Sequence, residues 1–439
     1  MNQFIHPITP GGVLSAAGAI VLGGLFFLTG PARAEEPYHT PLAGDAYHTT
    51  LFGEEVNVAP RDRTNLTALN LGLYYVPDIK EEVVTPFGTL YFWRNFDDGK
   101  TILRAVVSVV YNDVRYTVTP PALGGLEVVF TLHNFTVPVA QSEYVEGVEI
   151  DDALYWLQWN LGFGLGYSTK LAPGFQDNIL DVSLTYEPGM LTSRKSSETL
   201  PGYVVPQNTY EGRVHFRFRA DAMTRNIMEL AHHGLSGGVD VIYGNRTDWN
   251  SWGGDAAFGM SGGASHRNWL TAAAYAVAAG DVPFVQDERH RLIAQLHAGV
   301  GSHVDRFSAL RINGGPGGDE AEALSRVILP AGAFDEFFTP LYGIASLEYR
   351  YELLFFLYLH LKGDLAAVER YRFDTPSIQG PASYQLNTMP SVTAGLTSGF
   401  IWNSELEVYF THSFSMLRDI DRNPQFGGNS LVVSWSREF

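Results

Sequence analysis

The sequence contains no cysteine. This absence excludes a disulfide framework, a thiolate metal site and a cysteine nucleophile. Basic residues are also few, with 29 Lys and Arg against 47 Asp and Glu, which gives a formal net charge of −18. A nucleic acid is therefore not an expected partner, because binding to a phosphate backbone requires clustered positive charge.

Long apolar runs are absent outside the N-terminal region. There the apolar core extends from Val13 to Leu28, Gly30-Pro31 interrupts any helix, and Ala32-Arg33-Ala34 forms a small-x-small cleavage site. A membrane-spanning helix is the alternative, but this core is shorter than about 20 residues and contains Gly23-Gly24. We therefore expect residues 1–34 to be a secretory signal that is removed on export, although no Lys or Arg precedes the core.

The C-terminal stretch Ser430–Phe439 alternates between apolar and polar residues. One face is apolar and the other polar: Leu431, Val433, Trp435 and Phe439 against Ser434, Ser436 and Glu438. This period of two is typical of a strand with lipid on one side and water on the other. We expect the four apolar residues to form the C-terminal signal by which barrel assembly machinery inserts the protein.

Similar alternation recurs from about Leu66 onward, in segments of roughly ten residues, the length that a membrane-spanning strand needs. Because only helices and closed barrels satisfy the backbone in lipid, we predict an all-β, transmembrane antiparallel β-barrel over residues 64–439. Residues 35–63 have no clear period and are predicted to be a periplasmic lead-in or a lumenal segment. About sixteen strands are predicted, with fourteen as the alternative: Leu66–Tyr75, Pro86–Trp93, Ile102–Tyr111, Leu126–Phe135, Ala153–Tyr167, Asn178–Tyr186, Glu211–Arg219, Gly234–Tyr243, Asp255–Ser261, Trp269–Ala279, Arg291–His303, Tyr342–Leu353, Leu357–Val368, Val392–Trp402, Glu405–Ser415 and Ser430–Phe439.

The connections between these segments are of two kinds. Short ones such as Asn403-Ser404 are typical of periplasmic turns, and long polar or Gly/Pro-rich ones are expected outside the cell: Thr136–Asp152, Glu187–Tyr210, Gly244–Gly254 and Ala309–Pro340. The last of these contains a glycine-rich stretch, but no Gly-Lys-Ser/Thr follows it, which argues against phosphate binding.

Charged residues follow the same alternation in the two segments after this loop. Glu348 and Arg350 in one segment, and Lys362 and Asp364 in the next, all fall on the polar face that would line the lumen. The sequence Ser346-Leu347-Glu348, the following segment with Gly363-Asp364, and the closing segments together resemble the bacterial surface antigen superfamily of BamA-type outer-membrane assembly proteins.

The resemblance implies a loop that folds back into the barrel and is held there by an arginine. Arg311 would be the loop arginine, with Glu348 and Asp364 as its lumenal partners, since a guanidinium between two carboxylates makes charge-assisted bonds. The sequence departs from the family in two ways: Ile-Asn-Gly-Gly follows Arg311, and the chain has no room for POTRA domains. The alternative is a simple lumenal charge ladder that includes Arg350 and Lys362.

No catalytic, metal or cofactor site is predicted. His297 and His303 share a face but lie too far apart for one ion, and His232-His233 and His290 are expected to be solvated. Ser413 points away from its neighbour His412, which argues against a rim hydrolase. The acidic stretch Asp319–Glu322 could bind cations that bridge lipopolysaccharide.

The resemblance implies protein insertion or translocation at the outer membrane, and a passive porin-like channel for small solutes is the alternative. The expected partners are outer-membrane lipid and lipopolysaccharide, the barrel assembly machinery and an unidentified periplasmic protein.

Overall fold

The computed structural model describes residues 38–51, 53–60, 65–78, 84–136, 140, 144–145, 148–149, 153–171, 179–199, 201–253, 266–312, 327–329, 331–332, 336–373, 382–400, 404–420 and 423–439. The predicted signal, residues 1–34, lies outside these ranges, as does the candidate strand Asp255–Ser261. Within the described ranges, no helix is long and apolar enough to cross a membrane.

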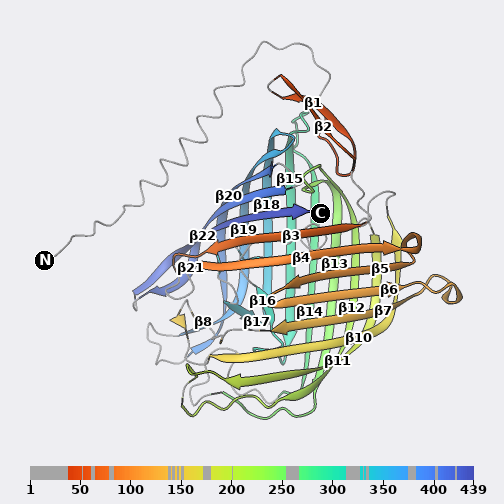
Figure 1. Cartoon of the computed structure of the whole chain (residues 1–439). Coiled ribbons are helices and arrows are strands. Elements are labelled where there is room, and N and C mark those ends of the chain that lie inside the picture. Colours follow the sequence, from red (N-terminus) through yellow and green to blue (C-terminus); the bar gives the residue numbers. More distant parts are fainter. Residues whose placement is uncertain are drawn as a thin grey trace. The chain divides into compact units, whose positions relative to one another are not determined.

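Sixteen antiparallel strands close into a barrel, which confirms the predicted fold class and strand number (Figure 1). Neighbours in sequence pair throughout, and β22 pairs with β3 to close the ring. The strands are β3 (Leu66–Tyr75), β4 (Val84–Phe96), β5 (Thr101–Ser108), β6 (Tyr111–Val118), β7 (Glu127–Thr136), β10 (Leu154–Lys170), β11 (Ile179–Lys195), β12 (Thr209–Arg225), β13 (Ala231–Arg246), β14 (Asn268–Asp281), β15 (His290–Ser302), β18 (Leu341–Leu354), β19 (Leu357–Phe373), β20 (Ala382–Phe400), β21 (Ser404–Ile420) and β22 (Asn423–Glu438).

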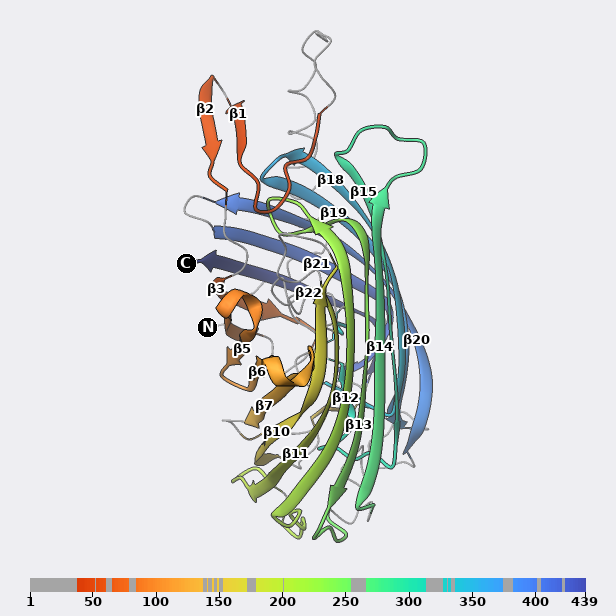
Figure 2. The same cartoon turned by 90° about the vertical axis from the view of Figure 1, so that its right-hand side faces the viewer.

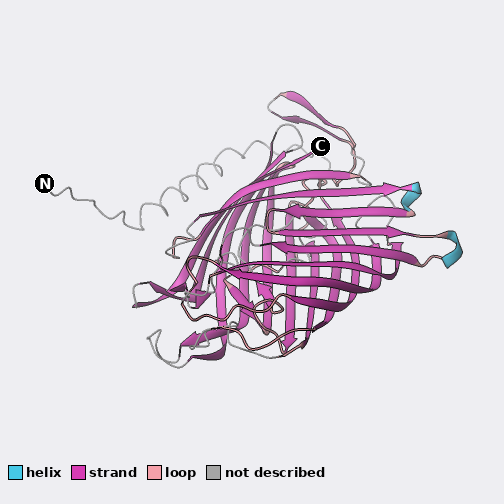
Figure 3. Ribbon diagram, turned by 60° about the horizontal axis from the view of Figure 1, so that its bottom comes forward, coloured by secondary structure: helices cyan, strands magenta, loops and turns pink. Residues whose placement is uncertain are grey.

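Among the described residues, helical structure is confined to two single turns between strands, η1 (Asp97–Gly99) and η2 (Pro121–Leu123) (Figure 3). Three short hairpins lie outside the barrel sheet: β1 (Tyr47–Leu51) with β2 (Glu54–Val58), β8 (Tyr144–Val145) with β9 (Val148–Glu149), and β16 (Leu310–Ile312) with β17 (Phe337–Thr339).

The strand β6 was not predicted as a separate element. The sequence predicts one strand from Ile102 to Tyr111 and no strand between it and Leu126. In the structure that strand ends earlier, and Asp113, Arg115 and Thr117 face the lumen while Tyr116 is exposed. The polar residues of β6 are therefore lumenal side chains of a strand.

Several strands extend further than the sequence predicts, some of them into predicted loops. Glu187 and Gly244 were each predicted to begin an outer loop, but β11 continues to Lys195 and β13 to Arg246. In a sequence, polar residues on the lumenal face of a strand are hard to distinguish from loop residues. Both kinds of residue contact water or other polar groups, so both are polar. The wall from β10 to β14 is consequently tall, as Figure 2 shows, whereas β5 and β6 have only 8 residues each.

The outer face of the barrel is apolar. On β10, Leu161, Phe163 and Leu165 are each more than half exposed, while the intervening Gly162 faces inward and is buried. Exposed leucine and phenylalanine at every second residue are what a strand in lipid requires, because the lipid covers them. This alternation on the outer face agrees with the predicted transmembrane barrel.

The first barrel strand, β3, begins at the same rim at which the last strand, β22, ends. This rim is called here the turn rim. There the backbone N–H of Phe439 donates to the carbonyl of Thr67 (2.9 Å), and the Arg437 guanidinium lies 5.1 Å from the centre of the Phe439 ring. Phe439 thus extends the pairing of β22 with β3 by one backbone hydrogen bond. A role of Phe439, Trp435, Val433 and Leu431 in insertion stays a prediction.

Residues 40–43 also attach at the turn rim. The Thr40 hydroxyl donates to Glu352 Oε2 (2.7 Å), and the Thr40 backbone N–H donates to Glu288 Oε2 (3.0 Å). Leu42 forms an antiparallel bridge with Asn226, in the turn between β12 and β13. Residues 40–43 are therefore fixed to the rim on the side of β12, β15 and β18, before the chain reaches β3.

Candidate functional site in the barrel lumen

The described residues of the connection between β15 and β18 turn back into the barrel and are called here the lumenal loop. Its hairpin pairs β16 with β17, and Arg311 is opposite Phe338 in the register. The described loop residues 303–312, 327–329, 331–332 and 336–340 contact the inward face of several strands. The predicted in-folding of this loop agrees with these contacts.

A buried ion pair fixes the start of the loop to the wall. Arg246, at the end of β13, donates from Nη1 to Asp305 Oδ2 (2.6 Å) and from Nε to Glu211 Oε2 (2.8 Å). The side chains of all three residues are at most 3% exposed. The second oxygen of Asp305 accepts the backbone N–H of Phe307 and the hydroxyl of Ser308, both at 3.0 Å. Buried charges need such partners, so this arrangement determines where the loop enters the lumen.

An aromatic cluster covers the ion pair. The ring of Phe307 lies 5.2 Å from Trp156, 5.3 Å from Trp252 and 6.0 Å from Trp249, measured between ring centres. The Arg246 guanidinium is stacked on Trp249 at 4.2 Å. These rings exclude water from the Arg246–Asp305 pair, which strengthens its attraction.

Arg311 lies against the same wall. Its guanidinium carbon is 4.0 Å from the ring centre of Phe135, 4.5 Å from Trp156 and 5.1 Å from Phe338. A planar guanidinium stacks well on aromatic faces, and desolvation makes the cation–π attraction larger. Arg311 therefore helps to hold the hairpin to β7 and β10.

The other side of the loop packs on the opposite wall. Ile312, Leu329 and Phe337 are at most 4% exposed. They form one apolar cluster with inward residues of β18 to β21: Tyr342, Ile344, Ala366, Val368, Met389 and Met416. The hydroxyl of Tyr74 in β3 donates to the carbonyl of Gly332. The loop is thus attached to β7, β10 and β13 on one side and to β3 and β18–β21 on the other.

The predicted partners of Arg311 have other contacts. Glu348 Oε1 bonds to Arg350 (2.9 Å) and to His360 (2.9 Å), and Arg350 also donates to the carbonyl of Ala231 (2.7 Å). Asp364 Oδ1 accepts the Ser346 hydroxyl and lies 2.9 Å from Lys362 Nζ.

Glu348, Arg350 and Asp364 are buried on the lumenal face, with Lys362 on the same side of its strand. The β16–β17 hairpin places Arg311 against Phe135 and Trp156. A latch that joins the three residues stays a prediction. The described residues contain a charge-assisted anchor of the opposite polarity: the arginine, Arg246, is in the wall, and the carboxylate, Asp305, is in the loop.

A second group of lumenal side chains forms a row of alternating carboxylates and imidazoles. His133 Nδ1 lies 3.2 Å from Asp113, and His133 Nε2 lies 3.3 Å from Glu187 Oε1. The same Glu187 oxygen is 3.1 Å from His215 Nδ1, and His215 Nε2 is 2.9 Å from Asp240. The row crosses the inner wall from β6 to β13, and its Asp240 end continues to Arg219.

This row is not among the sites predicted from the sequence. The histidines weighed there as metal ligands, His232, His290, His297 and His303, are not members. Strand alternation alone predicts that His133 faces the lumen, because it lies on the same face as Thr131, two residues earlier. Glu187, the central carboxylate, is missed because it is predicted to begin a loop.

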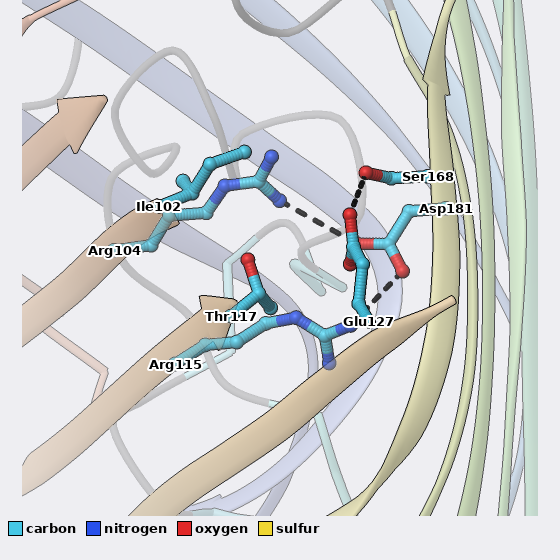
Figure 4. Close-up of a pocket in the computed structure, with 7 residues that line it drawn as sticks. All are labelled: Ile102, Arg104, Arg115, Thr117, Glu127, Ser168 and Asp181. Atoms are coloured by element: carbon cyan, nitrogen blue, oxygen red, sulfur yellow. Dashed lines mark hydrogen bonds and ion pairs between the residues drawn. The ribbon is translucent and has the colours of Figure 1, made fainter. Parts of the chain in front are cut away.

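A third polar group lies nearer the turn rim (Figure 4). Arg115 donates to Asp181 at 3.0 Å, and Arg104 lies 3.6 Å from the same carboxylate. The hydroxyl of Ser168 donates to Glu127. As Figure 4 shows, these side chains come from β5, β6, β7, β10 and β11 and point toward one another across a small pocket. Opposite charges thus neutralise one another along the inner wall.

No protein-family model matches the chain, and no curated protein matches its sequence. Several solved structures are similar to it. BamA from Haemophilus ducreyi lacking POTRA domains 1-3 gives a TM-score of 0.49 at 10% identity, over 99% of this chain and 80% of that one. The chain resembles BamA-type barrels.

CdiB from Acinetobacter baumannii gives a TM-score of 0.48 at 11% identity, over 90% of this chain and 66% of that one. CdiB from Escherichia coli gives 0.42 at 12% identity, over 92% and 68%. At these identities and TM-scores the similarity carries no argument about function, which has to be argued from the lumen itself.

Proposed function

We propose that this protein resides in the outer membrane and inserts or translocates polypeptide there, with a lumen that the lumenal loop closes between transfer events. The attachment of the loop to both sides of the barrel supports this proposal most directly. A polypeptide transporter must keep its membrane sealed when it is idle. A loop held by a buried ion pair and two apolar clusters is suited to that task.

A passive porin-like channel is the competing function. A porin keeps a permanent aqueous path, and its constriction loop usually lies on one side of that path. Here the Arg246–Asp305 pair is on one wall and the Ile312 cluster is on the other. Opening a wide path would require at least one of these attachments to separate, which favours a gated barrel.

The partners in this proposal are outer-membrane lipid and lipopolysaccharide around the apolar band, barrel assembly machinery during biogenesis, and a periplasmic protein that delivers the client. The chain has no cysteine and no predicted cofactor. No chemical reaction is part of the proposal.

Two measurements test the proposal. In planar bilayers, we expect the wild type to show small, unsteady conductance and Asp305→Asn to show larger, longer openings, because the variant weakens the bond to Arg246. Arg194→Ala removes an exposed arginine at the loop end of β11 and serves as the control, with wild-type conductance expected. A large, steady wild-type conductance that Asp305→Asn does not change would identify a porin.

The insertion activity needs a separate assay. Proteoliposomes that contain the protein would receive a urea-denatured eight-stranded outer-membrane barrel, and its folding would be followed by heat-modifiable gel mobility. We expect faster folding than in empty liposomes of the same lipid. Equal rates, together with failure to transport a secreted polypeptide into the vesicles, would reject protein transfer.

A further inference from the structure

Three side chains in the carboxylate–imidazole row are placed as metal ligands would be. His133 Nε2, Glu187 Oε1 and His215 Nδ1 all lie within 4.8 Å of one another. The two nitrogens are 3.3 Å and 3.1 Å from the Glu187 oxygen. Ligands around a tetrahedral zinc ion, with bonds of about 2.0–2.1 Å, are separated by about 3.3 Å. The two nitrogen–oxygen separations therefore match those of a zinc site, and the two nitrogens lie within 4.8 Å of each other.

The far side of each imidazole is also occupied as in a metal site. His133 Nδ1 lies 3.2 Å from Asp113, and His215 Nε2 lies 2.9 Å from Asp240. A histidine that binds a metal usually donates its other N–H to a carboxylate, which fixes the tautomer and orients the ring. Both rings thus direct one nitrogen toward Glu187 and hold the other on an aspartate.

Two atoms at the centre have unused bonding capacity. Glu187 is 1% exposed, and its Oε2 has no hydrogen-bond partner among the described residues. His133 Nε2 is likewise buried and makes no hydrogen bond to the part of the chain that the structure describes. Leaving such atoms unsatisfied costs free energy, and a cation at this point would satisfy both.

The strand between the ligands leaves space for them. Glu187 on β11 reaches His133 on β7 across β10, whose inward residue at this level is Gly162. A Cβ atom on Gly162 would lie 2.0 Å from Thr131 Oγ1 and 2.9 Å from Glu187 Cγ. The Thr185 hydroxyl donates to Glu187 Oε1 (2.9 Å) and orients the carboxylate. Glycine at position 162 is therefore needed for this convergence.

The site is accessible from the lumen. The side chains of His133, His215 and Asp240 are 17%, 13% and 27% exposed, so an ion and a coordinating water can reach the buried Glu187 along them. We infer that His133, Glu187 and His215 bind a divalent late first-row cation, Zn²⁺ in the first instance, with lumenal water completing the coordination. The ion would join β7, β11 and β12 on the inner wall. Imidazole and carboxylate ligands suit this class of metal.

The metal content of the untagged, folded full-length protein tests the inference. After treatment with a chelator, incubation with ZnCl₂ and dialysis, we expect about one zinc per chain by mass spectrometry of the metal, and a shift of the heat-modifiable unfolding to higher temperature. Co²⁺ in place of Zn²⁺ is expected to give the intense visible absorption of a low-coordinate site.

Variants separate this site from adventitious binding. Glu187→Gln and His215→Asn are expected to lose stoichiometric zinc, and Asp240→Asn to weaken affinity about 10- to 100-fold. His297→Asn removes a buried lumenal histidine outside the row and is expected to keep one zinc. Heat-modifiable mobility shows which variants fold. Absence of zinc from the wild type, or equal zinc in the Glu187 and His297 variants, would overturn the inference and leave the row as a set of ion pairs.

Discussion

Arg246 at the end of β13 donates to Asp305 of the lumenal loop over 2.6 Å, and the two side chains are 0% and 3% exposed. A buried pair of this kind contributes less to net stability than its short distance suggests, because both charges lose their hydration. It instead determines position, since each partner is costly to bury without the other. The loop can therefore enter the lumen at one place on the wall.

Replacing Arg246 with methionine should destabilise the folded barrel by about 3–5 kcal/mol, because Asp305 then stays buried without its guanidinium. The unfolding temperature in detergent, read from heat-modifiable mobility, measures the loss. Adding Asp305→Leu should recover most of it, because the second change removes the unpaired charge. If the double variant is as unstable as the single one, the ion pair is not what fixes the loop.

Arg311 gives a test between two models of how the loop is held. The aromatic contacts predict that Arg311→Ala shifts the closed loop toward opening by about 2 kcal/mol, or about 30-fold in the open population. Trp156→Leu should produce a similar rise in bilayer conductance. The latch implied by the family resemblance instead predicts that rise for Glu348→Gln. Conductance of the three variants side by side decides which group holds Arg311.

The sequence predicts the barrel well because alternation is a local property. Leu431, Val433 and Trp435 identify β22 without reference to any other strand, and fifteen of the sixteen predicted segments overlap barrel strands. The segment Asp255–Ser261 lies outside the described residues, and β6 replaces it in the count. Strand alternation also places Glu348 and Asp364 on the lumenal face.

The lumenal contacts could not be predicted in the same way. Whether Arg246 meets Asp305 depends on the closure of the ring and on the path of a loop, neither of which is a periodic feature. The row through His133, Glu187 and His215 joins residues from three strands that are far apart in the sequence. Alternation shows that each faces inward, but only the register between strands shows that they meet.

Gly162 offers a test of the packing under that row. Gly162→Ala should displace Thr131 and Glu187, with a loss of stability of about 1–3 kcal/mol, because a Cβ there lies 2.0 Å from Thr131 Oγ1. Gly343→Ala is the matched control on β18, where no atom lies within 4 Å of an added Cβ. The control should be neutral or slightly stabilising, since alanine restricts the unfolded chain. Equal effects of the two changes on the unfolding temperature would show that the crowding at Gly162 is not real.

The assignment of the outer face to lipid can be tested on one strand. Leu365, near the middle of β19, is 53% exposed, and Leu365→Arg should destabilise the inserted barrel by about 2–4 kcal/mol, because it places a charge in the hydrocarbon layer. Lys362→Arg changes a lumenal residue of the same strand and keeps its charge, so its effect should be small. Folding into lipid vesicles across a urea series measures both. If Leu365→Arg folds as stably as Lys362→Arg, this face of the barrel is not in contact with lipid.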